Sequence, residues 1–432
     1  MSERKKRPSI AISVTVVLIA LAAGAHFLSP NRSLAFPAAA RAETMPAETI
    51  EQGEMCLPNP VLASLEAAIP QDSRNVIGGD VAPIRTVEDP YYSLHSVSVD
   101  PANNRVVMTD SNRGGILFYD RSSGTKTTSV TEPIGHIRGP ATGMMFVAGV
   151  AIDPGRREVF TVDNDIGDRM MVFPYDAEGN IRPKRVLSVP HGAWGLALNL
   201  QRDEIAISIE HPNTVVVFKR DAKGLEAPKR VIHGPHAGLE DPHGIVFDVS
   251  ANEILVANHG NWAPLDREAA GDEDHPIPGR FDPPSITSYP GEAEGDVRPT
   301  RTIQGTATQL NWPMGISLDS VHDEIAVANY GNNSILIFHR TDNGNVAPVR
   351  VIRGDRTGVL GPMGVAFDAQ NEELWVTNYR DHSAVVFARD ANGNVEPKRI
   401  VRNAPPGTPA VGFGNPGAIA YDSKRKEILV PN

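Results

Sequence analysis

Two histidines and a tryptophan occupy equivalent places in a repeated segment, and these residue types can do chemistry together. The segment reads Gly-Val-Ala-Phe-Asp at residues 364–368, and related copies end at Asp100, Asp153, Asn199, Asp248, Asp319 and Asp422. The residues just before the copies are His95, Ala148, Trp194, His243, Met314, Met363 and Gly417. Imidazoles bind divalent metals and polarise carbonyls, so His95 and His243 are candidate metal ligands and catalytic residues. Trp194, Met314 and Met363 are ligand-binding candidates, or they fill an apolar centre.

A second set of polar residues lies where the next strand-like segment of each repeat ends. Its members are Asp110, Asp163, Glu210, Asn258, Asn329, Asn378 and Asn432. Oxygen ligands suit a hard cation, which makes five of them further metal candidates: Asp110, Asp163, Asn258, Asn329 and Asn378. The alternative is that Asn and Asp cap strand ends through Asx turns, and their recurrence in every repeat favours this interpretation.

Residues that break the repeat are candidates for a specific function. Glu210-His211 stands where other repeats have Asn-Tyr, so Glu210 and His211 are candidate catalytic residues. His259 precedes a long acidic insertion at residues 263–283 and is a ligand-binding candidate. A long loop on a rigid scaffold often carries function, although acidic loops are also commonly just solvated. No GxSxG, HExxH, P-loop or GxGxxG motif occurs in a supporting context.

The elements that position these residues are short strands. Each repeat spans about 50 residues and holds four runs of β-branched and aromatic residues, separated by Gly, Asn, Asp and Pro, without a helical period. The fourth run begins at a proline with an arginine two residues later, as at Pro183 and Arg185. Proline is tolerated at a sheet edge, so this run is the expected outer strand. Four short strands per repeat predict an all-β fold, a β-propeller of four-stranded blades.

The copies predict seven blades, with six as the alternative. The last copy stops after two strands, and residues 79–85 match residues 344–350, which belong to the outer part of another repeat. We therefore expect a closing blade shared by N- and C-terminal strands, with residues 73–88 beside residues 417–431. Six blades would form if the N-terminal segment packs elsewhere.

The N-terminus resembles an export signal. A basic stretch at residues 3–7 precedes an apolar run over residues 10–28, which predicts a cleaved signal peptide or a signal anchor within residues 1–28. Residues 29–71 are rich in Ala, Pro and Glu and predict a linker before a propeller at residues 72–432. The expected location is therefore periplasmic or at the cell surface, with membrane contact only through the N-terminal segment and anchoring in the inner membrane by residues 10–28 as one alternative.

Composition excludes several classes of protein. The 432 residues include 38 glycines and 36 prolines, too many for a helical bundle. The net charge of −11 argues against nucleic-acid binding. The single cysteine, Cys56, allows no intrachain disulfide framework and no cysteine-based zinc site.

The repeat resembles that of NHL-repeat and YVTN-type β-propellers. Residues 327–338 (Val-Ala-Asn-Tyr-Gly-Asn-Asn-Ser-Ile-Leu-Ile-Phe) and 376–387 carry this resemblance, as does the Pro-x-Arg-x-Ile-x-Gly ending found in exported bacterial NHL-type proteins. The resemblance covers residues 78–432 and implies the propeller fold. Because this architecture hosts both scaffolds and enzymes, it implies no single function.

The sequence favours a non-catalytic binding scaffold that holds a protein or small-molecule ligand on its loop face. The alternative is a metal-dependent enzyme, a lactonase or lyase, with its site at the mouth of the central channel. Similarity to amidating and virginiamycin-type lyases and to gluconolactonase-like propellers implies a divalent cation, calcium or zinc, as the one candidate cofactor.

Overall fold

The computed structural model describes residues 89–127, 129–164, 167–260, 262–263, 280–408, 410 and 420–429. The predicted signal segment (1–28), the linker (29–71) and most of the insertion (263–283) lie outside these residues. Residues 85–432 form a compact unit of their own. Among the described residues, no helix has the length and apolar character needed to cross a membrane.

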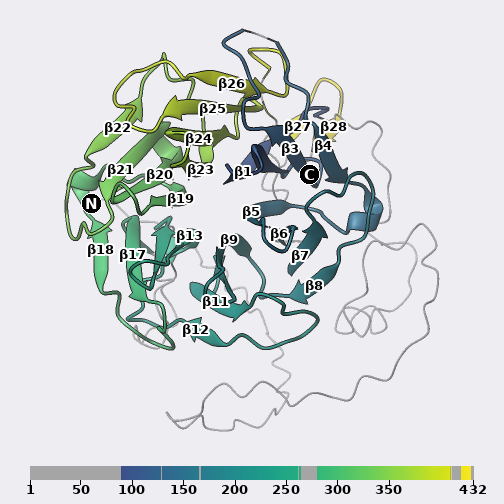
Figure 1. Cartoon of the computed structure of the whole chain (residues 1–432). Helices are drawn as coiled ribbons and strands as arrows, with labels where there is room; N and C mark the ends of the chain where they lie inside the picture. The colour runs from purple at the N-terminus through teal and green to yellow at the C-terminus, as the bar shows by residue number, and fades with distance from the viewer. Residues whose placement is uncertain are drawn as a thin grey trace, which may run out of the picture. The chain divides into compact units, whose positions relative to one another are not determined.

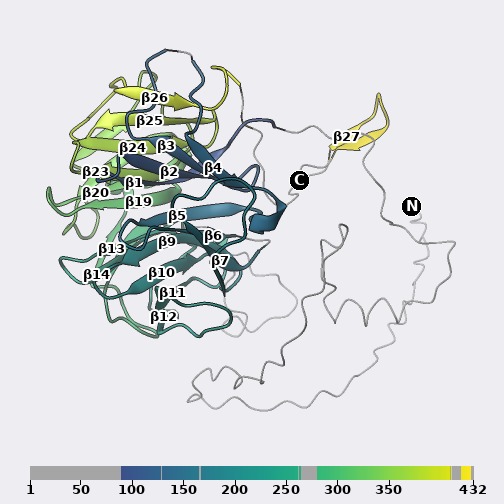
Figure 2. The same ribbon diagram turned by 45° about the vertical axis from the view of Figure 1, so that its right-hand side comes forward.

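The all-β propeller prediction is confirmed: six four-stranded antiparallel sheets form a ring (Figures 1 and 2). Blade 1 contains β1 (Leu94–Asp100), β2 (Arg105–Asp110), β3 (Gly115–Asp120) and β4 (Gly135–Arg138). Blade 2 contains β5 (Val147–Asp153), β6 (Glu158–Asp163), β7 (Arg169–Pro174) and β8 (Arg185–Ser188). Blade 3 contains β9 (Ala193–Asn199), β10 (Glu204–Ile209), β11 (Thr214–Lys219) and β12 (Arg230–Ile232).

The second half of the ring follows the same plan. Blade 4 contains β13 (Pro242–Asp248), β14 (Glu253–Asn258), β17 (Ser285–Pro290) and β18 (Arg301–Gln304). Blade 5 contains β19 (Pro313–Asp319), β20 (Glu324–Asn329), β21 (Ser334–His339) and β22 (Arg350–Arg353). Blade 6 contains β23 (Pro362–Asp368), β24 (Glu373–Asn378), β25 (Ser383–Ala388) and β26 (Arg399–Arg402). In every blade the first strand lies innermost and the fourth outermost (Figure 1).

Short elements complete the described chain. Within the insertion, β15 (Trp262–Ala263) pairs with β16 (Arg280–Phe281). Three 3-10 turns, η1 (Pro140–Thr142), η3 (Thr306–Thr308) and η4 (Tyr330–Asn332), lie in the loops. Near the C-terminus, β27 (Ala420–Asp422) pairs with β28 (Glu427–Leu429).

The ring closes after six blades, so the preferred prediction of seven is wrong and the alternative of six is confirmed. β1 contacts both β5 and β23, which makes the innermost strands of the first and last blades direct neighbours and leaves no gap for a seventh. Thr125, in the loop after β3, exchanges two backbone hydrogen bonds with Ile400 of β26. Among the described strands, β27 and β28 pair only with each other. The proposed partner segment, residues 73–88, lies outside the described residues.

Largely buried ion pairs tie the outer strand of blades 2–6 to the second strand. The first residue of each second strand is a glutamate, and the first residue of each fourth strand is an arginine that binds it with two hydrogen bonds. The pairs are Glu158–Arg185, Glu204–Arg230, Glu253–Arg301, Glu324–Arg350 and Glu373–Arg399. Further arginines cross between blades, and Arg220 donates to Asp153 of the preceding blade at 2.7 Å. Bidentate, charge-assisted bonds of this kind are strong and directional.

These pairs predict a loss of stability in acid. Hydrogen bonds from Arg185 lower the pKa of Glu158 to about 2. Burial alone would raise the pKa of Glu204 and Glu373, but their arginine and lysine partners outweigh burial and hold it at about 2. A carboxyl with a depressed folded-state pKa stabilises the fold above its unfolded pKa, here about 4.5, and loses that contribution as the pH falls towards 2.

Two other carboxyls act in the opposite direction at milder pH. Burial raises the pKa of Asp110 and Asp163 to about 6, so their contribution is largest when they are protonated and is lost as the pH rises through about 6. Burial of His95 and His243 offsets this gain, because it lowers their pKa to about 4 and about 3 and so removes stability as the pH falls below about 6.5. We therefore expect the thermal midpoint to fall steeply below about pH 4.5, where the glutamate and histidine contributions are both being lost. Differential scanning calorimetry from pH 8 to pH 3 checks this, and an equal midpoint at pH 6 and pH 3 would contradict it.

Candidate functional site at the mouth of the central channel

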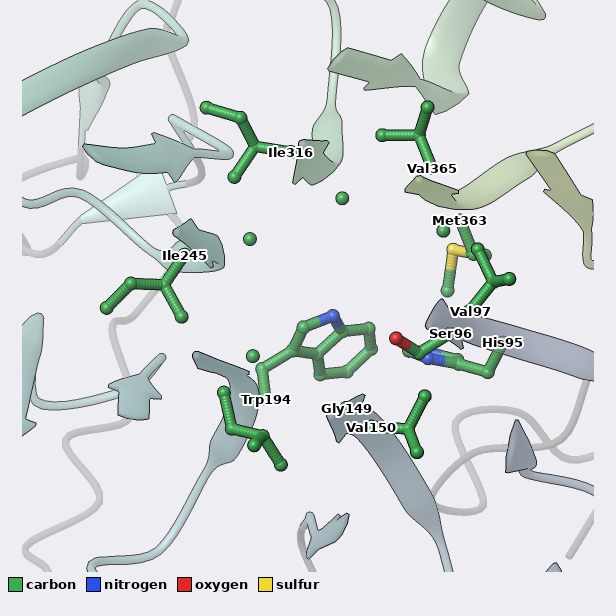
Figure 3. Close-up of a pocket in the computed structure, with 15 residues that line it drawn as sticks. His95, Ser96, Val97, Gly149, Val150, Trp194, Ile245, Ile316, Met363 and Val365 are labelled. Carbon is green, nitrogen blue, oxygen red and sulfur yellow. The ribbon is translucent and has the colours of Figure 1, made fainter. Parts of the chain in front are cut away.

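The first strands surround a central channel with an apolar wall. Each strand contributes one aliphatic side chain at the same level: Val97, Val150, Leu196, Ile245, Ile316 and Val365. Figure 3 shows Val97, Val150, Ile245, Ile316 and Val365 around the opening. The Trp194 indole extends across it, with His95 and Met363 beside it. Of the mouth residues expected from the sequence, His95, Trp194 and Met363 line this channel, whereas Gly417 lies outside the described residues.

The mouth residues are held in place by the neighbouring blade. Thr109 Oγ1 donates to the carbonyl of Ala148 at 2.7 Å, Ser208 Oγ donates to that of His243, and Thr377 Oγ1 donates to that of His95 at 2.6 Å. Glycine is required beside them because the blades approach so closely. A Cβ on Gly244 would lie 2.3 Å from the carbonyl oxygen of Met314. The backbone of the mouth ring is thus rigidly positioned.

A row of imidazole and indole rings runs along one side of the mouth. Ring centroids are 4.8 Å apart for His95 and Trp194, 4.6 Å for Trp194 and His243, and 4.5 Å for His243 and His259. Trp312 continues the row 4.7 Å from His259. Trp194 therefore separates His95 from His243, while His243 and His259, two residues that the sequence placed in different groups, are brought together.

Asp241, His243 and His259 form a cluster that could hold a metal ion. One ligand atom from each lies within 4.8 Å of the others, and the two imidazoles are buried. Nδ1 of His259 lies 3.0 Å from Oδ2 of Asp241, and Nδ1 of His243 lies 2.8 Å from the Asp241 backbone oxygen. A carbonyl oxygen can only accept, so Nδ1 of His243 carries the proton and Nε2 carries the lone pair.

Glu210 faces this lone pair. Its Oε1 lies 3.3 Å from Nε2 of His243, and both side chains are buried. Burial, followed by the neighbouring His259, lowers the pKa of His243 to about 3, so the ring is neutral at physiological pH. Two acceptors at this distance repel each other unless a proton or a cation lies between them. Glu210 and His243 can therefore share a proton or a cation.

Two more imidazoles of the mouth have the same orientation. Nδ1 of His95 donates to the Ala148 carbonyl at 3.2 Å. Nε2 of His95 and Nε2 of His259 are buried, with no hydrogen-bond partner among the residues that the structure describes. Burial lowers the pKa of His95 to about 4, so it too is neutral near pH 7. An imidazole fixed through Nδ1 with Nε2 left over is the arrangement found in metal-ligating histidines.

His211 lies at the exposed edge of the cluster. Its Nε2 is 4.0 Å from Oε2 of Glu210, and its ring is 5.4 Å from that of His191. Met314 and Met363 are both buried, and they pack in the core shared by blades 5 and 6. Met363 also lines the channel.

The Asp and Asn residues at the ends of the second strands cap the loops that lead into the mouth. Asp110 accepts from the Ser93 amide at 2.9 Å, and Asp163 accepts from that of Phe146 at 2.7 Å. Asn258, Asn329 and Asn378 accept in the same way from Glu240, Asn311 and Leu360. These five side chains come from five different blades, and the structure does not bring them to one centre.

Strand register corrects the placement of Glu210 in that set. Ile209 pairs with Ala193 just as Asn258 pairs with Pro242, so Ile209, not Glu210, is the counterpart of Asn258. Glu210 is instead equivalent to His259, and each donates its amide to the loop residue that precedes its mouth strand by one position. The two residues therefore project from adjacent blades at the same level, which explains why both reach His243.

Asp241 and Trp312 are site residues that the sequence did not single out. Both lie two positions before a mouth residue and have left-handed backbone, with φ of +55° and +52°. Glycine fills the equivalent positions 192 and 361, also at positive φ. A side chain larger than hydrogen is unusual there, and such strain concentrates at functional sites.

Comparisons with known proteins add only remote likenesses. No family model matches the chain, and no curated protein matches it. A chain of the nidogen/laminin complex is 14% identical, with a TM-score of 0.43, covering 69% of this chain and 89% of that one. Hydrazine synthase from Kuenenia stuttgartiensis is 11% identical, with a TM-score of 0.47 and coverages of 71% and 99%.

A functionally unknown protein from Desulfotomaculum acetoxidans is similar to about the same degree. It is 17% identical, with a TM-score of 0.46, and the match covers 70% of this chain and 84% of that one. Likenesses this remote carry no statement about function. The propeller assignment rests on the strand order and the blade contacts given above.

Proposed function

We propose that this protein is an exported NHL-type β-propeller that binds a small-molecule ligand at its channel mouth through a divalent cation. The observation that carries the proposal is the convergence of Asp241, His243 and His259, with ligand atoms within 4.8 Å of one another. The buried Nε2 atom of His259 adds support, because it has no hydrogen-bond partner within the described part of the chain and a buried polar atom is costly unless something satisfies it.

The donor set indicates the kind of cation. Two imidazoles and a carboxylate suit zinc or a similar transition metal, whereas calcium prefers six to eight oxygens. Zinc is therefore the expected metal of the two that the sequence suggested. Such a zinc ion would be held by Asp241, His243 and His259. Glu210 lies nearby and offers a further carboxylate.

The surrounding residues determine what such a centre could do. A bound zinc ion would supply a positive charge that attracts and polarises an oxygen of the ligand. The backbone oxygen of Asp241 orients the His243 imidazole, and Glu210 can hold a proton beside that ring. Trp194 contacts the ring of His243 on one side of the cluster, and Trp312 contacts the ring of His259 on the other.

Metal analysis of the full-length protein tests the proposal. We expect about one equivalent of zinc per chain by inductively coupled plasma mass spectrometry after purification without chelators. Re-addition to stripped protein should restore the same stoichiometry, and calcium should not compete. A chain that carries no metal and takes up none on titration would refute the cation centre.

A second candidate, a metal-dependent lactonase or lyase, is favoured by the contact between Glu210 and His243. A carboxylate beside a metal-binding imidazole can act as a general base. Turnover of a lactone panel that disappears in Glu210→Gln, while zinc content stays the same, would favour the enzyme. Zinc-loaded protein that binds ligands without turning any over would favour the binding role.

Export is the remaining part of the proposal, and it rests on the basic and apolar segments at residues 3–28. The membrane or cell-surface role of residues 10–28 can be tested by fractionating cells that express the full chain. Protection of residues 72–432 from protease added to intact cells, and their digestion once the outer barrier is opened, would agree with a periplasmic location.

A further inference from the structure

An exposed aromatic surface continues the row of rings away from the histidine cluster. Trp312 is 49% exposed and lies 6.1 Å from Tyr330, with the two ring planes inclined by only 14°. The guanidinium of Arg380 lies 4.5 Å from the centre of the Tyr330 ring, and its Nε donates to the Tyr330 hydroxyl at 3.1 Å. We call Trp312, Tyr330 and Arg380 the aromatic shelf.

The fold does not require a tryptophan at position 312. Its backbone is left-handed, at a position where Gly192 and Gly361 serve in other blades. The loop closes through the same backbone hydrogen bond in each case, from Glu210, Tyr330 or Tyr379 to the residue at this position. A half-exposed indole on a backbone that favours glycine costs stability, and such costs are typical of binding residues.

Arg380 is held against the shelf and directs its charge to the surface. Its side chain crosses Gly361, where an added Cβ would lie 2.7 Å from Arg380 Cγ. Among the described residues, no carboxylate lies within 4.0 Å of its guanidinium, whereas Arg389 pairs with both Glu324 and Glu372. The mouth thus presents a positive charge that the ion-pair network does not neutralise.

From this arrangement we propose that the aromatic shelf binds a ligand that combines a carboxylate with a ring that has an apolar face. The apolar face of the ring would lie on Trp312, and the carboxylate would pair with Arg380, whose planar fork matches carboxylate geometry. Uronic-acid sugars and aromatic carboxylic acids share this chemistry. The shelf adjoins the proposed cation centre at His259, but its binding does not require the metal.

Isothermal titration calorimetry on the full-length protein tests the shelf, with trigalacturonate, phenylacetate and the neutral maltotriose as probes. We expect at least one of the two acids to bind and maltotriose not to bind. Arg380→Gln and Trp312→Gly should each weaken the binding of that acid by about tenfold or more. Arg356→Gln, at an exposed arginine already paired with Glu396, is the control and should change nothing.

Trp312→Gly also separates binding from folding. Because the backbone angle at position 312 suits glycine, this variant should keep or raise the thermal midpoint while its binding of the acid is weakened. Trigalacturonate binding alone indicates a sugar ligand, and phenylacetate binding alone an aromatic one. The proposal is overturned if neither acid binds, if maltotriose binds as well as the acids, or if both variants bind normally.

The titrations are run on zinc-loaded protein and on protein stripped of metal and freed of chelator, with metal content measured on the same samples. Acid binding by protein that takes up no zinc would refute the cation centre and leave the shelf standing. One zinc per chain without acid binding would refute the shelf alone.

Discussion

Replacing His243 by alanine is expected to abolish stoichiometric zinc binding. His243 is the central member of the cluster, because it contacts Asp241, Glu210 and the ring of His259. Without it, the remaining imidazole and carboxylate form an incomplete site, and we expect the zinc affinity to fall by about 100-fold or more. Competition with a fluorescent zinc chelator measures the change.

Two further variants distinguish the loss of a zinc ligand from a general folding defect. Asp241→Gly removes a ligand at a position whose backbone suits glycine, so it should lose zinc while it keeps its thermal midpoint. His322→Ala removes a comparable histidine, whose Nδ1 lies 2.7 Å from Asp319 outside the mouth, and should leave the zinc affinity unchanged. Equal zinc affinity in wild type, His243→Ala and Asp241→Gly would contradict the assignment.

Glu204→Gln is expected to cause the largest loss of stability. The Glu204 side chain is fully buried, and it binds the nearly buried Arg230 through two hydrogen bonds of 2.8 and 2.9 Å. Lys229 also binds it. Glutamine cannot neutralise these cations, and breaking a buried pair from one side costs about 3–5 kcal/mol. Thermal denaturation should show a midpoint lower by several degrees, and urea unfolding should show a lower midpoint concentration.

The matched control is Glu372→Gln. Glu372 also pairs with an arginine, Arg389, at 2.8 Å, but its side chain is 58% exposed. Exposed pairs contribute at most about 1 kcal/mol, so this variant should unfold close to the wild-type midpoint. If the two variants were destabilised equally, burial of the ion pair would not be the source of its strength.

The sequence predicted the outer strands well but missed their ion pairs. The Pro-x-Arg pattern predicted fourth strands that begin at the proline, and the structure places them there within two residues, because β8 and β12 begin at Arg185 and Arg230. Their partners, Glu158 and Glu204, open the second strands of the same blades. The two positions lie more than 20 residues apart, and only the folded sheet brings them together.

The candidate site was predicted in part. His243 was recognised as one of the mouth residues and His259 as an exception within the repeat, and they were assigned to different roles because one precedes a first strand and the other follows a second. Glu210 was recognised too, with its register displaced by one residue, because Ile209 replaces the usual Asn or Asp. Asp241 and Trp312 were missed, since their significance lies in a left-handed backbone that the residue letters do not show.

The sequence by itself determined the all-β fold and the four-stranded blade, because these follow from short runs of β-branched and aromatic residues and from turns repeated about every 50 residues. The tertiary structure decided the blade number, because closure depends on how neighbouring blades pack and not on how many copies the chain carries. It also decided which polar residues meet. Glu210, His243 and His259 come from two adjacent blades, and their contact depends on strand register and blade spacing, which no segment of the sequence contains alone.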